Sequence, residues 1–249
     1  MKHQNLFPVD THNVVLPGHF TNLKKWMHRL PALFSSPSIS PSKVTLLCGI
    51  PGVGKGAAVR VIAKTLGRPL FLLDGAIPLT SLSRIAIEAE PSVLWVDCLG
   101  DENTGLLRWL QTTEATNVFV VFTTDAPHRL PPVFTRADVV DTVWHLDLPT
   151  LRQRSGLWGE LLFARITGPH THDSVKLGQL SGMFTPAEIG ATYDRAVLSC
   201  GAPPNEGALI DAVLAMKPLA LRMDEGLACL RAWAREHALG ASSGGRRKM

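Results

Sequence analysis

The stretch that decides the fold is Gly49-Ile50-Pro51-Gly52-Val53-Gly54-Lys55. It follows a short apolar run, Val44–Cys48, that is typical of a buried strand, and it precedes residues 55–66, whose pattern is that of an amphipathic helix. The three glycines let the backbone wrap closely, so that successive N–H groups point at phosphate oxygens. The lysine adds a positive charge, and the start of the helix directs its positive dipole end at the same anion. The stretch therefore predicts a phosphate-binding loop.

A nucleotide, ATP or ADP, is the ligand that such a loop predicts. The residues expected to contact it are Gly49, Pro51, Gly52, Val53, Gly54, Lys55, Gly56 and Ala57. The position after the lysine is normally Ser or Thr, whose hydroxyl ligates Mg²⁺, and here it is Gly56. Because Mg²⁺ usually keeps several waters, a water can take the vacant place. Nucleotide binding is expected to survive with the metal held less firmly.

A second apolar run, residues 93–96, ends in Asp97, the carboxylate expected to hold the water shell of the metal. The next residue is Cys98, where a glutamate would polarise the attacking water. Loss of a positioned general base typically lowers the rate about 10²- to 10⁴-fold. Asp101 and Glu102 follow closely and are interpreted as solvated loop charges. The sequence therefore predicts impaired ATP hydrolysis.

Short apolar runs alternate with helical patterns through the first 149 residues. The expected strands are residues 44–48, 69–73, 93–96, 118–122 and 143–146. The expected helices are residues 21–34, 55–66, 79–89 and 104–111, then 150–165, 174–181, 186–198, 205–215 and 223–238. Continuous apolar strands with intervening helices imply a parallel sheet covered on both faces. The predicted fold is an α/β core followed by a small all-helical domain.

The expected domain limits follow from these patterns. Residues 1–42 form an amino-terminal segment, irregular up to residue 17, with a first helix that packs on the core. Residues 43–149 form the α/β core, residues 150–240 the helical domain, and residues 241–249 a disordered basic tail.

The composition excludes some classes of protein. Hydrophobic residues make up 45% of the chain and charged residues 18%, so a substantial core can be buried. No apolar stretch approaches the roughly 20 residues needed to span a bilayer, so a cytoplasmic protein without a membrane span is expected. The formal net charge is +4, and three of these charges lie in the tail, on Arg246, Arg247 and Lys248. The folded part is nearly neutral, so nucleic acid is not indicated as a partner.

The order of motifs along the chain resembles the AAA family, above all the AAA proteins of cyanobacteria and plastids and their bacterial relatives. The similarity covers about residues 18–240. The segments that carry it are Asn22-Leu23-Lys24-Lys25-Trp26, the loop at 49–55, Val93-Leu94-Trp95-Val96-Asp97, Val118-Phe119-Val120-Val121, Leu130-Pro131-Pro132, Asp147-Leu148-Pro149 and Gly182-Met183-Phe184-Thr185-Pro186-Ala187-Glu188-Ile189.

This resemblance implies further roles. Asp125 falls on the sensor position at the end of the fourth strand, where the family usually has Asn. Arg136 matches the first of two arginines that act on the nucleotide of a neighbouring subunit in a ring, and the second falls on Val139. The segment at residues 74–78, where relatives carry a longer loop with an aromatic residue, is short here, so a translocase that unfolds proteins is not supported.

Three hypotheses remain open at this point. The first is an ATP-binding remodelling ATPase with weak hydrolysis, in which the adenine lies between the core and the helical domain. The second is a catalytically inactive regulatory or scaffold subunit. For either, the resemblance implies a homo- or hetero-oligomeric AAA ring, with a protein partner that the sequence does not identify. The third is a loader-type ATPase of a nucleic-acid machine, against which the near-neutral core argues.

Overall fold

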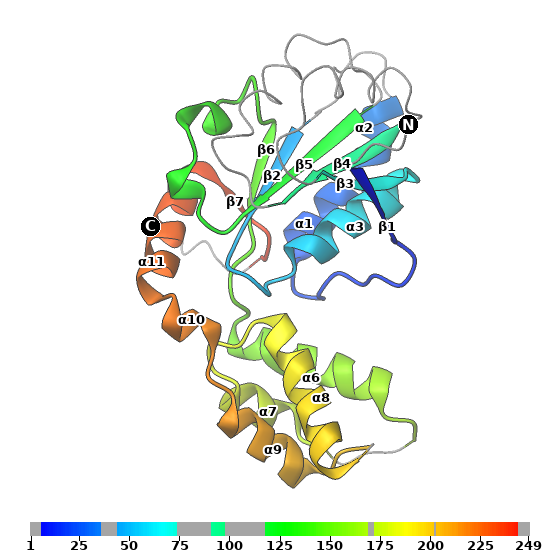
Figure 1. Cartoon of the computed structure of the whole chain (residues 1–249), viewed down its shortest axis with the longest axis vertical. Coiled ribbons are helices and arrows are strands. Elements are labelled where there is room, and N and C mark those ends of the chain that lie inside the picture. Colours follow the sequence, from blue (N-terminus) through cyan, green and yellow to red (C-terminus); the bar gives the residue numbers. More distant parts are fainter. Residues whose placement is uncertain are drawn as a thin grey trace.

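A computed structural model describes residues 6–35, 44–73, 91–97, 118–168, 172–201 and 203–243. The helices predicted at 79–89 and 104–111 lie outside these ranges, as do the loop at 74–78, Cys98, Asp101 and Glu102. Figure 1 shows two lobes. One is an α/β lobe, and the other is a lobe of helices that begins with α6 (Leu151–Arg165), after strand β6 (Thr142–His145). Among the described residues, no helix combines the length and the apolar character that crossing a membrane requires.

The α/β lobe is built on one sheet with the strand order β1-β3-β4-β5-β2-β6-β7. The strands are β1 Leu6–Val9, β2 Val44–Cys48, β3 Leu70–Leu73, β4 Ser92–Val96, β5 Val118–Thr124, β6 Thr142–His145 and β7 Leu239–Gly240. Neighbouring strands pair in parallel except β1, which pairs antiparallel with β3. The predicted fold class, an α/β core with a parallel sheet flanked by helices and then a small helical domain, is confirmed.

Two strands were not expected. The prediction that residues 1–17 are irregular is wrong for β1, whose Pro8 suits an edge position because proline has no N–H to donate to the sheet. β7 follows the last helix and pairs with β6, although no strand was predicted after residue 149. At two residues it is too short to leave a pattern in the sequence.

The helices agree closely with the expected ones. They are α1 Thr21–Met27, α2 Leu30–Ser35, α3 Lys55–Leu66, α6 Leu151–Arg165, α7 Ser174–Leu180, α8 Pro186–Cys200, α9 Glu206–Ala215, α10 Leu219–Arg222 and α11 Asp224–His237, with short 3-10 helices η2 Pro127–Arg129 and η3 Pro132–Thr135. The single helix predicted at 21–34 is interrupted at His28 and Arg29. Pro31, which lacks an N–H, fits the first turn of a new helix better than the interior of a continuous one.

Alternate side chains of the sheet enter two apolar cores on its two faces. One face packs on α1, α3 and α11, with Leu23, Val59, Ile62, Val93 and Leu230 among its buried residues. The other face contains Leu46, Leu94, Val120, Phe122, Phe134 and Val140. The helical lobe has its own core, formed by α6 to α9 and centred on Trp158, Leu177, Phe184, Ile189 and Leu209.

The last helices return to the sheet. Figure 1 shows α10 and α11 running from the helical lobe back to the α/β lobe, where Leu227 joins the same core as Ile50 and Val53 of the predicted phosphate-binding loop. Residues 241–243, which were predicted to be disordered, are fixed here. Ala241 is buried, and its carbonyl accepts hydrogen bonds from the N–H groups of Asn22 and Leu23.

Candidate functional site

The loop between β2 and α3 turns at its glycines. Gly52 and Gly54 have φ angles of +85° and +111°, a left-handed backbone that residues with side chains rarely adopt. Gly49 is required for a different reason, because a Cβ there would lie 2.4 Å from the backbone oxygen of Leu146. The geometry of the loop therefore depends on all three glycines.

Lys55 begins α3 and folds back over the loop. Its Nζ donates to the backbone oxygens of Gly49 and Ile50, at 2.6 and 3.3 Å. Gly54 is the N-cap of α3, and within the described residues no side-chain hydrogen bond caps this helix start. An anion at the loop would meet the positive end of a helix of 12 residues. It would also meet an ammonium group that can exchange its carbonyl partners for phosphate oxygens.

Asp97 directly follows β4, and its side chain is exposed. The hydroxyl of Thr123, on the neighbouring strand β5, donates to Asp97 Oδ1. The indole Nε1 of Trp95 donates to the same hydroxyl oxygen at 3.0 Å. The indole also lies against α3, since a Cβ on Gly56 would be 3.1 Å from Trp95 Cη2. Asp97, the predicted metal residue, and Gly56, where the usual metal-binding hydroxyl is missing, are thus linked through Trp95 and Thr123.

Asp125 directly follows β5, beside the phosphate-binding loop. The N–H of Gly49 donates to the carbonyl of Thr124 at 3.2 Å, which brings the end of β5 next to the first residue of the loop. Asp125 itself is exposed. Because β5 lies between β4 and β2 in the sheet, Asp97, Asp125 and the loop share one edge.

Arg136 lies on a surface loop after η3. It forms an ion pair with Asp138, through Nε at 3.0 Å and through Nη2, and both side chains are more than half exposed. Val139, at the position of the second arginine of the family, is buried in the core that contains Phe134. The apolar residue at 139 is therefore explained by packing, whereas Arg136 faces solvent, where a second chain can reach it.

The helical lobe contacts the phosphate-binding loop directly. The N–H of Ala187 in α8 donates to the carbonyl of Gly52 at 3.2 Å. A Cβ on Gly52 would be 2.7 Å from Thr185 Oγ1. Thr185 caps α8 in a capping box with Glu188, and the Glu188 carboxylate also accepts from the N–H of Leu219 at 2.7 Å. This carboxylate connects the helix that contacts the loop with the helices that return to the sheet.

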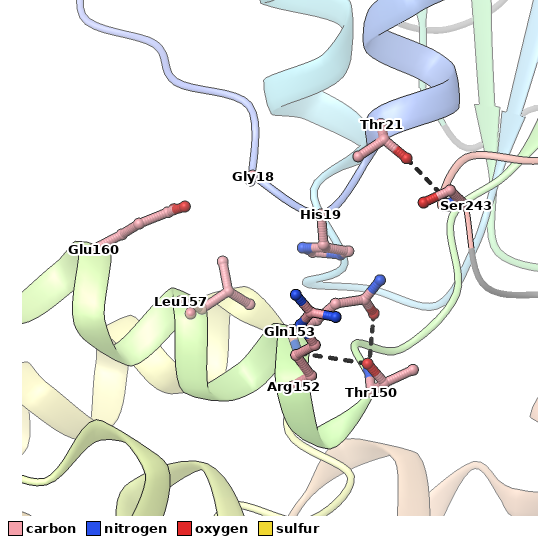
Figure 2. A pocket seen from close by; sticks show the side chains of 10 residues that line it. Gly18, His19, Thr21, Thr150, Arg152, Gln153, Leu157, Glu160 and Ser243 are labelled. Atoms are coloured by element: carbon pink, nitrogen blue, oxygen red, sulfur yellow. Dashed lines mark hydrogen bonds between the residues drawn. The ribbon is translucent and has the colours of Figure 1, made fainter.

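A pocket of about 510 Å³ opens between the segment before α1 and helix α6. Its lining residues are Gly18, His19, Thr21, Thr150, Arg152, Gln153, Gly156, Leu157, Glu160 and Ser243. Figure 2 shows His19 facing Arg152 and Gln153 of α6, with Leu157 further along the same helix. The pocket therefore lies between the core and the helical lobe, the interface at which the first hypothesis expects the adenine.

His19 lines this pocket, and its ring nitrogens can form hydrogen bonds with a ligand. It is 8% exposed, and within the described part of the chain both of its ring nitrogens are buried without a hydrogen-bond partner. Burial, and then the charge of Lys24, lowers its pKa to about 4, so the ring is neutral at pH 7. A neutral imidazole offers one donor and one acceptor. Sequence reasoning missed His19 because its role depends on the packing of the two lobes.

Comparison with known proteins agrees with this architecture. No family model matches the chain. The sequence is 29% identical to an uncharacterized AAA domain-containing protein, ycf46, of Pyropia yezoensis, over 87% of this chain and 51% of that protein. It is 25% identical to a proteasome-activating nucleotidase of Methanosarcina mazei, over 67% of this chain and 46% of that protein. The chain spans about half the length of the curated relatives that it matches.

Solved structures show the same fold. The AAA domain of FIGL-1 in complex with ADP superposes with a TM-score of 0.71 at 17% identity, over 96% of this chain and 95% of that one. A katanin structure gives a TM-score of 0.70 at 18% identity, over 88% of this chain and 89% of that one. The chain resembles AAA P-loop ATPases in sequence, and its fold is that of an AAA domain.

Proposed function

We propose that this AAA-type chain binds ATP through the loop at residues 49–55, responds to it by a change between its lobes, and hydrolyses it weakly. The observation that carries the proposal is that three parts lie close together, since a Cβ on Gly54 of the loop would be 3.4 Å from the ring of Phe20, the residue after His19. The parts are a glycine-dependent loop at the start of a helix, a pocket with a neutral histidine whose ring nitrogens have no partner among the described residues, and a helical lobe hydrogen-bonded to the loop. The sequence relatives are AAA proteins, and FIGL-1, with the same fold, was solved with ADP.

The phosphates fit the loop. The absence of a side chain at Gly49 and Gly52 lets the loop backbone pack closely against Leu146 and Thr185, which helps to fix the shape of the loop. Lys55 supplies the one charged side chain of the loop. Its Nζ donates hydrogen bonds to two carbonyl oxygens of the loop, which hold the ammonium group over it. Anion binding at such a helix start needs no other side chain.

The base fits the pocket. A volume of about 510 Å³ lies within the range of small-molecule sites. Leu157 supplies an apolar contact, and the donor and acceptor of neutral His19 match the polar edge of a purine. Binding there would satisfy two buried nitrogens that have no partner among the described residues, and an unmet buried polar group costs about 1–3 kcal/mol.

Of the two positions that usually hold Mg²⁺ in a P-loop site, 56 and 97, only 97 has a suitable side chain here. The Asp97 carboxylate is a suitable oxygen donor for the water shell of the ion. Gly56 provides no hydroxyl, and the Trp95 ring lies against the place where one would begin. Bound Mg²⁺ would neutralise phosphate charge, and we infer that it is positioned less firmly than in a P-loop with Ser or Thr at this position.

Weak turnover follows from the residues at three positions. Gly56 lacks the metal-binding hydroxyl, Cys98 replaces the residue that would polarise water, and Asp125 places a carboxylate near the γ-phosphate. Arg136 on the surface loop is proposed to act on a neighbouring copy in an assembled ring. The katanin structure, which shares this fold, concerns the structural basis of katanin self-assembly, and this supports the proposal that the chain assembles.

An inactive regulatory or scaffold subunit is the second candidate, and the contact between Trp95 and Gly56 favours it, because the ring lies where the side chain of a metal-binding Ser or Thr would begin. Turnover measured at rising protein concentration distinguishes the two. A specific rate that rises with concentration indicates an active ring, whereas ATP binding without phosphate release indicates the inactive subunit.

Calorimetric titration with ATP tests the proposed binding site. Lys55→Ala should weaken ATP binding about 10- to 100-fold, the equivalent of one lost charged hydrogen bond. Arg60→Ala is the matched control, since Arg60 is an exposed cation on the same helix. Equal affinity in wild type and Lys55→Ala would place the nucleotide elsewhere.

A further inference from the structure

We propose that Thr123, oriented by Trp95, is a positioning residue that holds the Asp97 carboxylate for the metal. This inference rests on the proposed function, namely that Mg²⁺ and a nucleotide bind at the loop. It assigns a role to two side chains that neither the motifs nor the relatives point to.

The backbone brings the three residues together. β4 and β5 pair in parallel, with Val96 opposite Phe122. Asp97 and Thr123 each lie one residue beyond this pair, so their side chains leave the sheet on the same face. Trp95, two residues before Asp97, lies on that face as well. It is the face covered by α3, which places the indole against Gly56.

The hydrogen bonds run in one direction. Trp95 Nε1 can only donate, and it donates to Thr123 Oγ1 at 3.0 Å. The single proton of the Thr123 hydroxyl is then directed to Asp97 Oδ1, since the other acceptor in reach, the carbonyl of Val96, lies at 3.4 Å. Thr123 is fully buried, whereas Asp97 is exposed. A rigid buried donor thus restrains an exposed carboxylate that would otherwise rotate freely in solvent.

The restraint matters more here than in a site with two metal-binding side chains. With glycine at position 56, the loop supplies no hydroxyl for the metal, so the position of the metal depends more on the Asp97 carboxylate. A hydrogen bond to Oδ1 leaves Oδ2 for the metal or its water and limits the carboxylate to few rotamers. Outer partners of this kind typically change metal affinity about 10- to 100-fold.

The test measures Mn²⁺ affinity by electron paramagnetic resonance, in the presence of ADP, alongside ADP affinity in EDTA. Thr123→Val should weaken Mn²⁺ binding about 10-fold and leave the affinity for ADP in EDTA unchanged. Thr123→Ser should restore Mn²⁺ binding, because it keeps the hydroxyl. Trp95→Phe should give an intermediate loss, since the hydroxyl is then no longer oriented.

Thr45→Val is the matched control. Thr45 is also fully buried in a strand, and its hydroxyl donates to the carbonyl of Thr142 at 2.9 Å, away from Asp97. Its loss should lower stability without changing Mn²⁺ affinity. The inference is overturned if Thr123→Val binds Mn²⁺ as tightly as wild type does. If Thr123→Val does not fold, the same result for Trp95→Phe overturns it. Wild type that binds no ADP with or without metal would instead refute the proposed function itself.

Discussion

The N–H of Ala187 in the helical lobe donates to the carbonyl of Gly52 in the phosphate-binding loop, at 3.2 Å. One hydrogen bond therefore joins the first turn of α8 to the segment that is proposed to hold the phosphates. If the proposed function holds, a change of the loop on nucleotide binding should act on the angle between the lobes through this contact. Glu188 extends the connection to α10, whose neighbour α11 packs on the sheet.

Gly52→Ala should disrupt this junction. The new Cβ would lie 2.7 Å from Thr185 Oγ1, and the φ of +85° strains any residue with a side chain. We expect a loss of about 1–3 kcal/mol in the free energy of unfolding, measured by urea denaturation, together with weaker ATP binding. Gly190→Ala in α8, where a Cβ meets open space, is the control and should be neutral or slightly stabilising. A Gly52→Ala variant as stable as wild type would show that the lobes do not meet as described.

Gly56→Ser alone should not restore a full metal site. The serine Cβ would lie 3.1 Å from Trp95 Cη2, so the indole must shift before the new hydroxyl can reach the metal. We expect Mn²⁺ affinity to rise less than about 10-fold, a smaller change than a well-placed outer partner gives. The shift should appear as a changed Trp95 fluorescence, identified by comparison with Trp95→Phe. A large gain in affinity without any spectral change would contradict the packing.

His19 should make stability depend on pH. Its pKa is about 4 in the fold against 6.5 when unfolded, so the unfolded chain binds more protons between these values. The stabilisation from neutral His19 is complete above pH 6.5 and is lost as the pH falls towards 4. Urea denaturation of wild type and His19→Gln from pH 7.5 to pH 4.5 measures this term. His145, whose pKa burial also lowers, is present in both proteins and cancels in the difference. Parallel curves for the two proteins would contradict the prediction.

Arg231→Met should weaken the attachment of α11 to the α/β lobe. The Arg231 guanidinium donates to both oxygens of Asp147, at 2.8–3.2 Å, on the connector between β6 and α6. Because both side chains are partly exposed, we expect a loss of only about 0.5–1 kcal/mol in the free energy of unfolding. Arg165→Met breaks a more exposed pair with Asp194 and should cost less. A larger loss for Arg165→Met than for Arg231→Met would count against this ranking.

Local patterns were enough to predict the central strands, α3 and the glycine loop. Five apolar runs identified β2 to β6, and the loop was recognised because a strand precedes it and a helix follows it. The edge strands β1 and β7 escaped prediction because one contains a proline and the other has two residues. The break between α1 and α2 was not predicted, because the periodic pattern of apolar residues takes no account of Pro31.

The candidate site was predictable only where it is local in sequence. Lys55, Gly56 and Asp97 each lie next to a strand or helix end, so spacing identified them. Trp95 and Thr123 meet through the register of β4 with β5. His19 acquires its environment only when α6 packs opposite the segment before α1. Such relationships depend on packing between distant segments, which a single sequence does not show.

The measurement that tests the central claim most directly is ATP binding and phosphate release from one preparation of the wild-type chain. A fluorescent ATP analogue gives the affinity, and phosphate release is followed at increasing protein concentration. We predict binding with a Kd on the order of micromolar and turnover far below the median of about 10 s⁻¹ for enzymes. Failure to bind ATP or ADP at millimolar concentration would contradict the account, however well the fold matches that of an AAA domain.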